Sequence, residues 1–308
     1  MKWRTEVQVE NNNGYIRYNH SMVAIGSCFA DEIGGKLKDG GMDISVNPFG
    51  VIFNPVSIMQ LIQNTLDGNL LDSLILERDM KFFHYGFHSK VYGTDKNDLT
   101  KNIESIQYNI QRRLLEGDRL FLTFGTAWVY RLIEQNTIVA NCHKMPANLF
   151  NKELIDLDKL KERSVLLFER IFEENPKLKV MITVSPVRHV KDGLHENNIS
   201  KGLLHLLCAH LVNHFKQVTY FPAFEMLVDD LRDYRFYKED LIHPNNQAVN
   251  YVFDHFKQSQ FDDETMAKFS LHEKLKKAKD HHFINASIEE VRKHEDYINN
   301  LEAKLTEL

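Results

Sequence analysis

Short apolar runs that alternate with helix-forming segments restrict the fold of this 308-residue chain more than any other feature. Five such runs begin the segments 21–27, 42–47, 119–128, 177–189 and 218–226. They are continuously apolar rather than alternating, which is typical of parallel strands buried on both faces. Repeated strand–helix units predict a mostly parallel sheet with helices on both sides. We therefore predict a three-layer α/β/α domain with a flavodoxin-like, five-stranded sheet.

Helical patterns follow the predicted strands, directly or after an inserted segment. They cover 28–40, 54–68, 98–118, 156–176, 200–215 and 245–261. Asn54 and Ser200 are expected as N-caps, with Pro55 in the first helical position. Gly117 and Pro176 are expected to end their helices.

Three segments stand apart from this alternation. The aromatic-rich stretch 76–94 is interpreted as an insertion or an irregular hairpin, and 129–144 as a β-hairpin that turns at 134–137. The tail, 262–308, carries charged helical patterns that predict a helical hairpin packed on the domain or a partner surface. The expected division is a domain over 1–261 and a C-terminal helical extension over 262–308.

Bulk properties narrow the function classes. The formal net charge is −5 and the isoelectric point about 6.3, which argues against a nucleic-acid partner. Three cysteines do not make a disulfide framework, and the first fifteen residues contain no apolar signal core, so a cytoplasmic location is expected. No apolar run is long enough for a membrane span. The 15 histidines show no metal-ligand spacing, and no metal or other cofactor is expected.

The first strand ends at a turn that could carry chemistry. Ligand sites in open parallel sheets form at the carboxyl ends of the strands, and Ser27 follows Gly26 at such an end. The N-terminus of the following helix offers unpaired N–H groups, which could hold the oxyanion formed when a serine attacks a carbonyl. Serine at this place is more commonly just an N-cap. The turn alone leaves both roles open.

A second element lies just before the last predicted helix, where Asp240 precedes His243 by three residues. Histidine is the usual general base near neutral pH, and its second ring nitrogen needs a partner that fixes the tautomer. An aspartate at this spacing can supply that partner from the same loop. Together with a Gly-Ser turn, the pair suggests a serine nucleophile with its base.

The motif "GSCFA" at 26–30 resembles the signature of the GSCFA-domain family, which in turn resembles the SGNH (GDSL-like) hydrolases. Further similar stretches lie at 47–55, 124–130, 141–146, 185–189, 220–226 and 230–244. The resemblance implies Ser27 as nucleophile, with His243 as base and Asp240 as its partner. It also implies an oxyanion hole of backbone amides from Ser27 or Cys28 and from Gly50.

The resemblance fails at one place. The third sequence block of SGNH hydrolases carries Gly-x-Asn, whose asparagine donates to the oxyanion, but the matching residues here are Gly125, Thr126 and Ala127. Loss of one such donor can lower the rate about 100- to 1000-fold. Asn47, Asn54, Thr126 and Asn141 are the possible replacements.

Several neighbouring residues have two interpretations. Cys28 could be a reactive thiol at a helix N-terminus, or a small apolar side chain packed under the turn, which the resemblance favours. His143 either contacts substrate or belongs to a polar turn. Arg188, beside His189 near the expected cleft, either binds an anionic group or pairs with an acid in 230–237 and braces the loop of His243; bracing is favoured. The aromatic strip 82–93 either lines a cleft or forms the core of an inserted subdomain.

The function expected from these features is a serine acyl hydrolase or acyltransferase that needs no cofactor. The resemblance implies a small-molecule or carbohydrate ester as substrate. Two alternatives remain from other classes. One is a carbohydrate- or ligand-binding module that has lost turnover, and the other is an interaction protein that acts through the C-terminal helices. The oligomeric state is left open.

Overall fold

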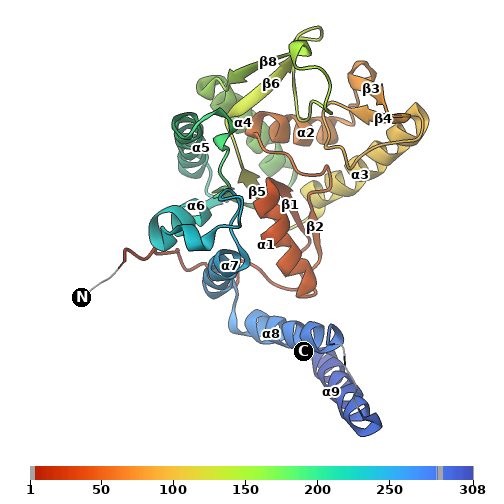
Figure 1. The fold of residues 1–308 in the computed structure, drawn as a ribbon, viewed down its shortest axis with the longest axis vertical. Helices are drawn as coiled ribbons and strands as arrows, with labels where there is room; N and C mark the ends of the chain where they lie inside the picture. Colours follow the sequence, from red (N-terminus) through yellow and green to blue (C-terminus); the bar gives the residue numbers. More distant parts are fainter. Residues whose placement is uncertain (1–3, 282, 284–286, 308) are drawn as a thin grey trace.

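The central feature of the fold is a parallel sheet of five strands. The computed structural model describes residues 4–281, 283 and 287–307. The strands of the sheet are β1 (Met22–Gly26), β2 (Ile44–Val46), β5 (Arg119–Phe124), β9 (Lys179–Val184) and β10 (Val218–Tyr220). Their order is β10-β9-β5-β1-β2, with every pairing parallel (Figure 1). Counted along the chain within this sheet, the order is the flavodoxin-like 2-1-3-4-5, as predicted.

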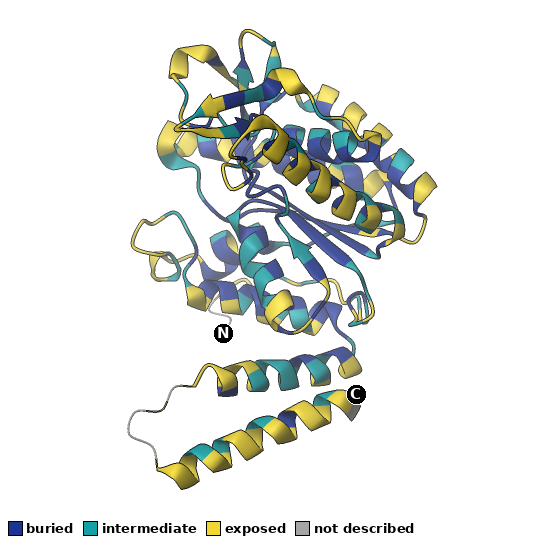
Figure 2. Ribbon diagram, turned by 90° about the vertical axis from the view of Figure 1, so that its right-hand side faces the viewer, coloured by how far each residue is buried: buried dark blue, intermediate teal, exposed yellow. Residues whose placement is uncertain are grey.

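Helices cover both faces of the sheet. One face carries α2 (Pro55–Asp67), α3 (Lys96–Glu116), α4 (Leu157–Glu174) and α5 (Leu194–His214); the other carries α1 (Cys28–Asp39) and α7 (Asn246–Gln260). Successive strand residues point to opposite faces. In β1, Val23 and Ile25 therefore pack with the first group, whereas Met22 and Ala24 pack with the second. Figure 2 shows the buried strands between the two helical layers.

Local signals in the sequence explain most helix ends. Asn54 caps α2 by accepting a hydrogen bond from the Ser57 amide at 2.8 Å, and Gly68 closes the helix in a left-handed conformation. The predicted start of α5 at Ser200 is wrong, because the helix begins six residues earlier, after Gly193. Ser200 lies inside the helix, and its hydroxyl accepts a hydrogen bond from the Ala127 amide at 2.7 Å.

Two small antiparallel sheets occupy the insertions. The segment predicted as 76–94 forms the hairpin of β3 (Ile75–Arg78), which begins one residue earlier, and β4 (Lys81–His84). The predicted hairpin after β5 is β6 (Trp128–Leu132) with β7 (Thr137–Val139), to which β8 (Phe150–Leu154) adds a strand that the sequence did not suggest. Both sheets share one apolar cluster that includes Phe83, Tyr85 and Phe150. Part of the aromatic strip therefore forms a subdomain core, whereas Phe87 and Val91 pack into the main core.

Short elements complete the chain. They are η1 (Asp72–Leu74), η2 (Ala147–Leu149), η3 (Val190–Asp192), α6 (Ala223–Glu225), the π-helical turn η4 (Met226–Leu231) and η5 (Tyr234–Phe236). Of these, η3 follows β9, and η5 precedes the Asp240–His243 segment, so both border the carboxyl edge of the sheet.

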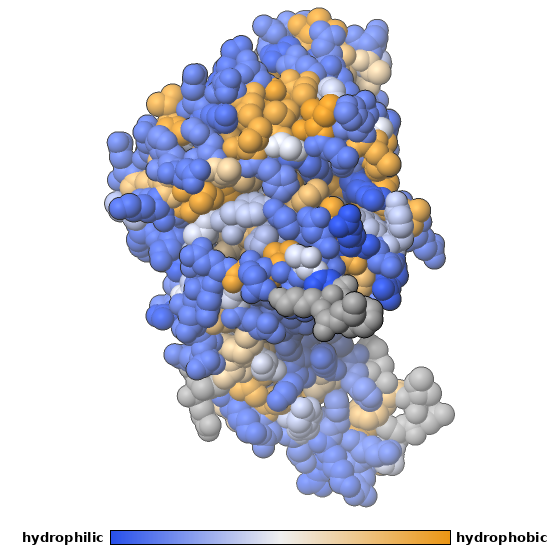
Figure 3. Space-filling model, turned by 90° about the vertical axis from the view of Figure 1, so that its left-hand side faces the viewer, coloured by the Kyte–Doolittle hydropathy of each residue, from blue (hydrophilic) through white to orange (hydrophobic). Residues whose placement is uncertain are grey.

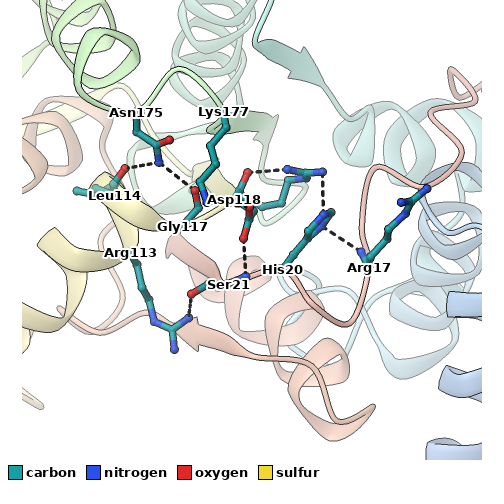
Figure 4. A network of polar contacts seen from close by, with 10 residues as sticks. Arg17, His20, Ser21, Arg113, Leu114, Gly117, Asp118, Asn175 and Lys177 are labelled. Carbon is teal, nitrogen blue, oxygen red and sulfur yellow. Dashed lines mark hydrogen bonds and ion pairs between the residues drawn. The ribbon is translucent and has the colours of Figure 1, made fainter. Parts of the chain in front are cut away.

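The amino edge of the sheet is closed by polar contacts (Figure 4). Asp118 accepts a hydrogen bond from the Ser21 amide at 2.9 Å, and Arg113 donates to the Ser21 hydroxyl at 2.9 Å. Asn175 donates to the carbonyls of Leu114 and Gly117, at 3.0 and 2.9 Å. These contacts fix the strand entrances to one another, so room for a ligand is to be sought at the opposite, carboxyl edge.

The tail forms two helices, α8 (Asp263–Lys279) and α9 (Ile288–Glu307), that lie side by side (Figure 2). Phe269 of α8 is 1% exposed and belongs to the same apolar cluster as Phe253 and Phe256 of α7. Lys279 and Glu302 pair at 2.6 Å across the two helices. The predicted helical hairpin is therefore present, with α8 packed on the α/β unit.

The outer surface is polar with apolar areas. Apolar side chains gather in the upper part of the face shown in Figure 3. Leu166 of α4 and Leu206 of α5 are among the exposed apolar residues. Within the described residues, no helix combines the length and apolarity needed to cross a membrane.

Candidate active site

Strand β1 passes into α1 through a turn that only glycine can begin. Gly26 has a φ of +153°, and a Cβ there would lie 2.3 Å from the Thr123 carbonyl oxygen. Ser27 follows and is 1% exposed. Its hydroxyl accepts a hydrogen bond from the Phe29 amide at 3.3 Å, so Ser27 is the N-cap of α1. Capping leaves the hydroxyl at the positive end of the helix, where an anion is also stabilised.

Asn47 holds this turn from the neighbouring strand. Its Oδ1 accepts from the Gly26 amide at 2.8 Å, and its Nδ2 donates to Asp31 at 2.7 Å. The backbone at Asn47 has a φ of +42°, a conformation that asparagine tolerates better than most residues. Both ends of the Asn47 side chain are therefore engaged within the fold.

The expected oxyanion amides are mostly engaged. The Ser27 amide donates to the Thr123 carbonyl at 3.0 Å, and the Gly50 amide donates to the Asn47 carbonyl at 2.8 Å. Both expectations are therefore corrected for this conformation. Cys28 is the first residue of α1, where an amide has no partner within the helix. Its N–H is the one of the three that remains suited to an oxyanion.

Cys28 itself is half-buried, and its environment disfavours the thiolate. Burial, followed by the Asp31 carboxylate, raises the pKa of the Cys28 thiol above its ordinary value. A helix N-terminus alone would lower it. The thiol is thus a poorer nucleophile than the position suggested, in agreement with packing under the turn.

The third-block residues do not offer a side-chain donor. Ala127 is fully buried in the main core. The Thr126 hydroxyl lies 3.2 Å from the Ser200 hydroxyl and accepts from the Trp128 amide at 3.1 Å. These contacts tie the β5–β6 connection to α5 and engage the Thr126 hydroxyl within the fold.

Two other expected binding residues belong to turns of the inserted subdomain. The Asn141 side chain accepts from the His143 amide at 2.7 Å and donates to Ser89 at 3.4 Å. His143 is 2% exposed, and its Nε2 lies 3.0 Å from the His84 carbonyl oxygen. Both side chains therefore stabilise the subdomain. Asn54, the third, is the cap of α2 described above.

Asp240 and His243 are in direct contact. Asp240 Oδ2 lies 2.7 Å from His243 Nδ1, while Oδ1 accepts from the amides of Ile242 and His243 at 2.9 and 3.0 Å. These contacts, led by the His243 amide, lower the pKa of Asp240 to about 2. The ionised carboxylate thus fixes one ring nitrogen of His243 and leaves Nε2 for another partner.

Arg188 braces the loop that carries this pair. Its guanidinium carbon lies 4.8 Å from the centre of the Tyr237 ring and 5.2 Å from that of Tyr234. Its amide donates to the Ile242 carbonyl at 3.3 Å and its side chain to the Leu241 carbonyl at 3.4 Å. The bracing interpretation is therefore supported, with aromatic rings rather than an acid as partners.

The loop lies at the carboxyl edge of the sheet and against α1. The contacts of Arg188 join it to the end of β9, and Lys238 pairs with Glu32 of α1 at 3.7 Å. A positive charge on His243 lowers the pKa of the His189 ring. Between the described residues Ser27 and His243, however, no hydrogen bond is formed. Catalytic hydrogen bonds are often long in structures without substrate.

Two residues of this edge were not selected from the sequence as functional. Lys201 is buried and donates to the carbonyls of Gly125 and Ser185, at 2.6 and 2.7 Å. Burial lowers its pKa to about 7. The helical spacing could have indicated that Lys201 is buried. It lies four residues after Asn197 and three before Leu204, on the buried face of α5.

His189 is the second such residue. Its Nε2 is buried and has no hydrogen-bond partner among the described residues. A Cβ added at Gly125 would lie 3.3 Å from His189 Nε2 and 3.3 Å from Ser27 Cβ. The histidine nitrogen and the serine thus both lie beside Gly125, as does the Phe53 carbonyl oxygen at 3.1 Å from the same point. The described residues contain no group of three or more His, Cys, Asp or Glu side chains that could hold a metal ion.

Solved structures of other proteins are similar to this chain. Among solved structures, a protein assigned as an acylhydrolase from Bacteroides fragilis is 10% identical, with 80% of this chain and 88% of that chain covered and a TM-score of 0.40. The family 3 carbohydrate esterase of Clostridium thermocellum is also 10% identical, with 78% and 94% covered and a TM-score of 0.36.

A carbohydrate esterase family 2 enzyme with its carbohydrate-binding domain, from Corynascus thermopiles (Myceliophthora fergusii), is 9% identical. The alignment covers 86% of this chain and 69% of the chain of that enzyme, with a TM-score of 0.40. No curated protein matches the sequence. The family model described as the GSCFA family matches residues 21–256, most of the chain and nearly all of the α/β unit. The chain therefore belongs to the GSCFA family.

Proposed function

We propose that this protein is a serine-dependent ester hydrolase or acyltransferase, with Ser27 as nucleophile and His243 as general base. The observation that carries the proposal is the Asp240–His243 pair, with its 2.7 Å contact, at the edge of the sheet where Ser27 caps α1. A base with a fixed tautomer, near a hydroxyl at a helix N-terminus, is the arrangement that acyl transfer requires.

The proposed reaction proceeds in two halves. Ser27 Oγ attacks the ester carbonyl, and His243 Nε2 accepts the hydroxyl proton. The tetrahedral intermediate collapses, the proton passes from His243 to the leaving alcohol, and an acyl-serine remains. Water or an acceptor alcohol then attacks the acyl carbon, His243 takes its proton, and Ser27 is released with its proton restored. Asp240 stays ionised throughout and stabilises the imidazolium of His243.

The substrate class proposed is a small-molecule or carbohydrate ester. The choice between hydrolysis and transfer depends on which nucleophile reaches the acyl-serine. Hydrolysis releases the free acid, whereas transfer moves the acyl group to an alcohol of the acceptor. An assay of acetate release from an acetylated oligosaccharide, with and without added acceptor sugar, separates the two reactions.

The decisive experiment is labelling with a fluorophosphonate, which reacts with activated serines. We expect wild-type protein to be labelled, Ser27→Ala to be unlabelled and Cys28→Ser, the matched control one residue along, to be labelled as in wild type. His243→Ala should slow labelling at least 100-fold, because the base that activates the serine is lost. Labelling that persists in Ser27→Ala would contradict the assignment.

The same experiment tests the non-catalytic alternative. A binding module would show no labelling and no release of acetate, together with measurable oligosaccharide binding by calorimetry. The structural observation behind this alternative is the engagement of the Ser27 and Gly50 amides by backbone carbonyls, which leaves few free donors for an oxyanion.

A further inference from the structure

We infer that His189 donates a hydrogen bond from Nε2 to the oxyanion that forms when Ser27 attacks its substrate. This inference rests on the proposed function and names a further catalytic residue for it. Developing negative charge on the carbonyl oxygen must be met by preorganised donors, and these contribute strongly to the rate.

Geometry is the first support. His189 Nε2 and Ser27 Cβ lie at the same distance, 3.3 Å, from the point where a Cβ of Gly125 would stand. They are therefore no more than twice that distance apart. Because residue 125 is glycine, it places no side chain between the two groups. An ester carbonyl bound to Ser27 would place its oxygen on this side or on the side of the Cys28 amide.

The missing partner of His189 is the second support. A buried polar atom without a hydrogen bond destabilises the folded state, so such atoms are rare unless they have a function. Nε2 is buried and unpaired among the described residues. The rest of the residue is held in place: its amide donates to Asn197 at 2.9 Å, and its ring packs edge-on against Phe53.

Other donors at this edge are already used. The amides of Gly125 and Thr126 both donate to the Phe53 carbonyl, at 2.7 and 3.1 Å. The Lys201 ammonium donates to the carbonyls of Gly125 and Ser185. With the Ser27 and Gly50 amides engaged as well, His189 would supply a second donor beside the Cys28 amide.

The surroundings of His189 favour a neutral ring that donates rather than a cation. Burial lowers the pKa of His189 to about 4, and the charges of Lys201, His243 and Lys152 act in the same direction. Asp192 opposes them, but it is ion-paired with Lys152. A neutral imidazole carries one N–H, and a neutral histidine can polarise a carbonyl oxygen in this way.

These surroundings also distinguish His189 from a general base. A base must accept a proton and hold it as a cation, and the pKa of His189 makes that cation unfavourable at neutral pH. His243 has the Asp240 carboxylate in contact for this purpose. The two histidines thus have separate roles, one as donor to the oxyanion and one as proton acceptor.

The test compares two substitutions at His189 in the full chain, with p-nitrophenyl acetate as substrate and the fluorophosphonate as probe. His189→Ala should lower kcat and kcat/KM together by about 100- to 1000-fold and slow labelling by a similar factor, with KM changed less than about threefold. His189→Gln, whose amide can donate from nearly the same place, should regain at least tenfold of that loss.

A matched control lies at the opposite edge of the sheet. His20, beside Asp118 and Arg17 in Figure 4, also has its pKa lowered to about 4, chiefly by burial. His20→Gln should leave kcat and the labelling rate unchanged. Thermal unfolding of all three variants, followed by circular dichroism, shows whether the effect at His189 is separate from a loss of folded protein.

The possible outcomes distinguish this inference from the proposed function on which it rests. Wild-type protein without hydrolysis and without labelling at Ser27 would overturn both. Active wild type with unchanged kcat in folded His189→Ala would overturn only the role of His189. If folded His189→Gln were as inactive as Ser27→Ala, the donor role of His189 would be wrong.

Discussion

Single residues at the β1–α1 turn combine backbone and chemical demands. Gly26 is required by its positive φ and by its close approach to Thr123, and Asn47 holds its amide. Ser27 then caps α1, so its hydroxyl is fixed by the same hydrogen bond that starts the helix. The helix cap alone therefore positions the hydroxyl. For this reason the sequence Gly-Ser is compatible with a cap and with a nucleophile.

Gly125 provides a test at this scale. Gly125→Ala should lower kcat/KM at least tenfold, because the added methyl would occupy the space between Ser27 and His189, 3.3 Å from each. The neighbours need to move by only a few tenths of an ångström, so the melting temperature should fall by only a few degrees. Steady-state kinetics and thermal unfolding measure the two effects.

Gly202, on α5, is the matched control. A Cβ there would meet nothing within 4 Å, and alanine is favoured over glycine in a helix by about 1 kcal/mol. Gly202→Ala should therefore keep full activity and be slightly more stable. Equal activity in Gly125→Ala and Gly202→Ala would show that the space beside Ser27 is not used.

At the scale of elements, the 237–244 loop depends on a neighbour for its shape. Leu241 has a φ of +57° and is 50% exposed, an unfavourable conformation for a branched side chain. Arg188, from the end of β9, holds this loop through the carbonyls of Leu241 and Ile242 and through the rings of Tyr234 and Tyr237. The base is thus positioned by an element far away in sequence.

Arg188→Ala should lower kcat/KM at least tenfold, since His243 would lose its fixed position relative to Ser27. Arg188→Lys should recover little, because an ammonium lacks the planar group that stacks on the tyrosine rings. Arg235→Ala is the control: its side chain is 71% exposed and its guanidinium faces Phe236 in the same region. A wild-type rate in Arg188→Ala would show that the loop needs no brace.

At the scale of the whole molecule, the C-terminal helices differ in how they join the rest. The Phe269 ring of α8 lies 5.7 Å from Phe253 and 5.3 Å from Phe261. A chain that ends at residue 261 should lose at least about 3 kcal/mol of unfolding free energy, because these rings would be exposed. A chain that ends at residue 280 keeps α8 and should retain fluorophosphonate labelling.

Urea unfolding of the two truncated chains tests the predicted boundary between 261 and 262. Equal stability of the 1–261 chain and the full chain would support that boundary as a domain limit. The interaction alternative is tested by the longer truncation, which removes α9 alone. Loss of partner capture with labelling intact would assign the outer helix to binding.

The pH dependence of stability is a second whole-molecule property. Burial lowers the pKa of His84 to about 4, below its unfolded value of about 6.5. The unfolded chain therefore binds more protons between these values, so unfolding free energy is highest above about pH 6.5 and falls as the pH drops towards 4. Protonation would also break the bond from the Gly86 amide to Nδ1, at 2.9 Å.

His84→Gln removes this proton-binding site and should show a shallower decline of the unfolding free energy between pH 6.5 and 4. Denaturant unfolding at several pH values measures both slopes. If the variant and wild type declined in parallel, the acid sensitivity would come from other groups, such as His20 and His189, whose pKa values are also lowered to about 4.

The sequence by itself determined the five strands, their parallel arrangement, most helix ends and the family. Those features depend on local periodicity, caps and right-handed crossovers, which neighbouring residues encode. It also placed Ser27 and the Asp240–His243 pair at strand ends and helix starts. It missed β8 and placed the start of α5 six residues late, because the pairing partner of β8 and the packing of Ser200 are distant in the chain.

Only the tertiary structure decided which polar side chains remain free. Asn47, Thr126, Asn141 and His143 look like donors in the sequence, yet each contacts a group that is distant in the chain. His189 became prominent for the opposite reason, since its Nε2 is buried with no partner among the described residues. Hydrogen-bond satisfaction is a property of three-dimensional surroundings, and residue type and spacing alone do not encode it.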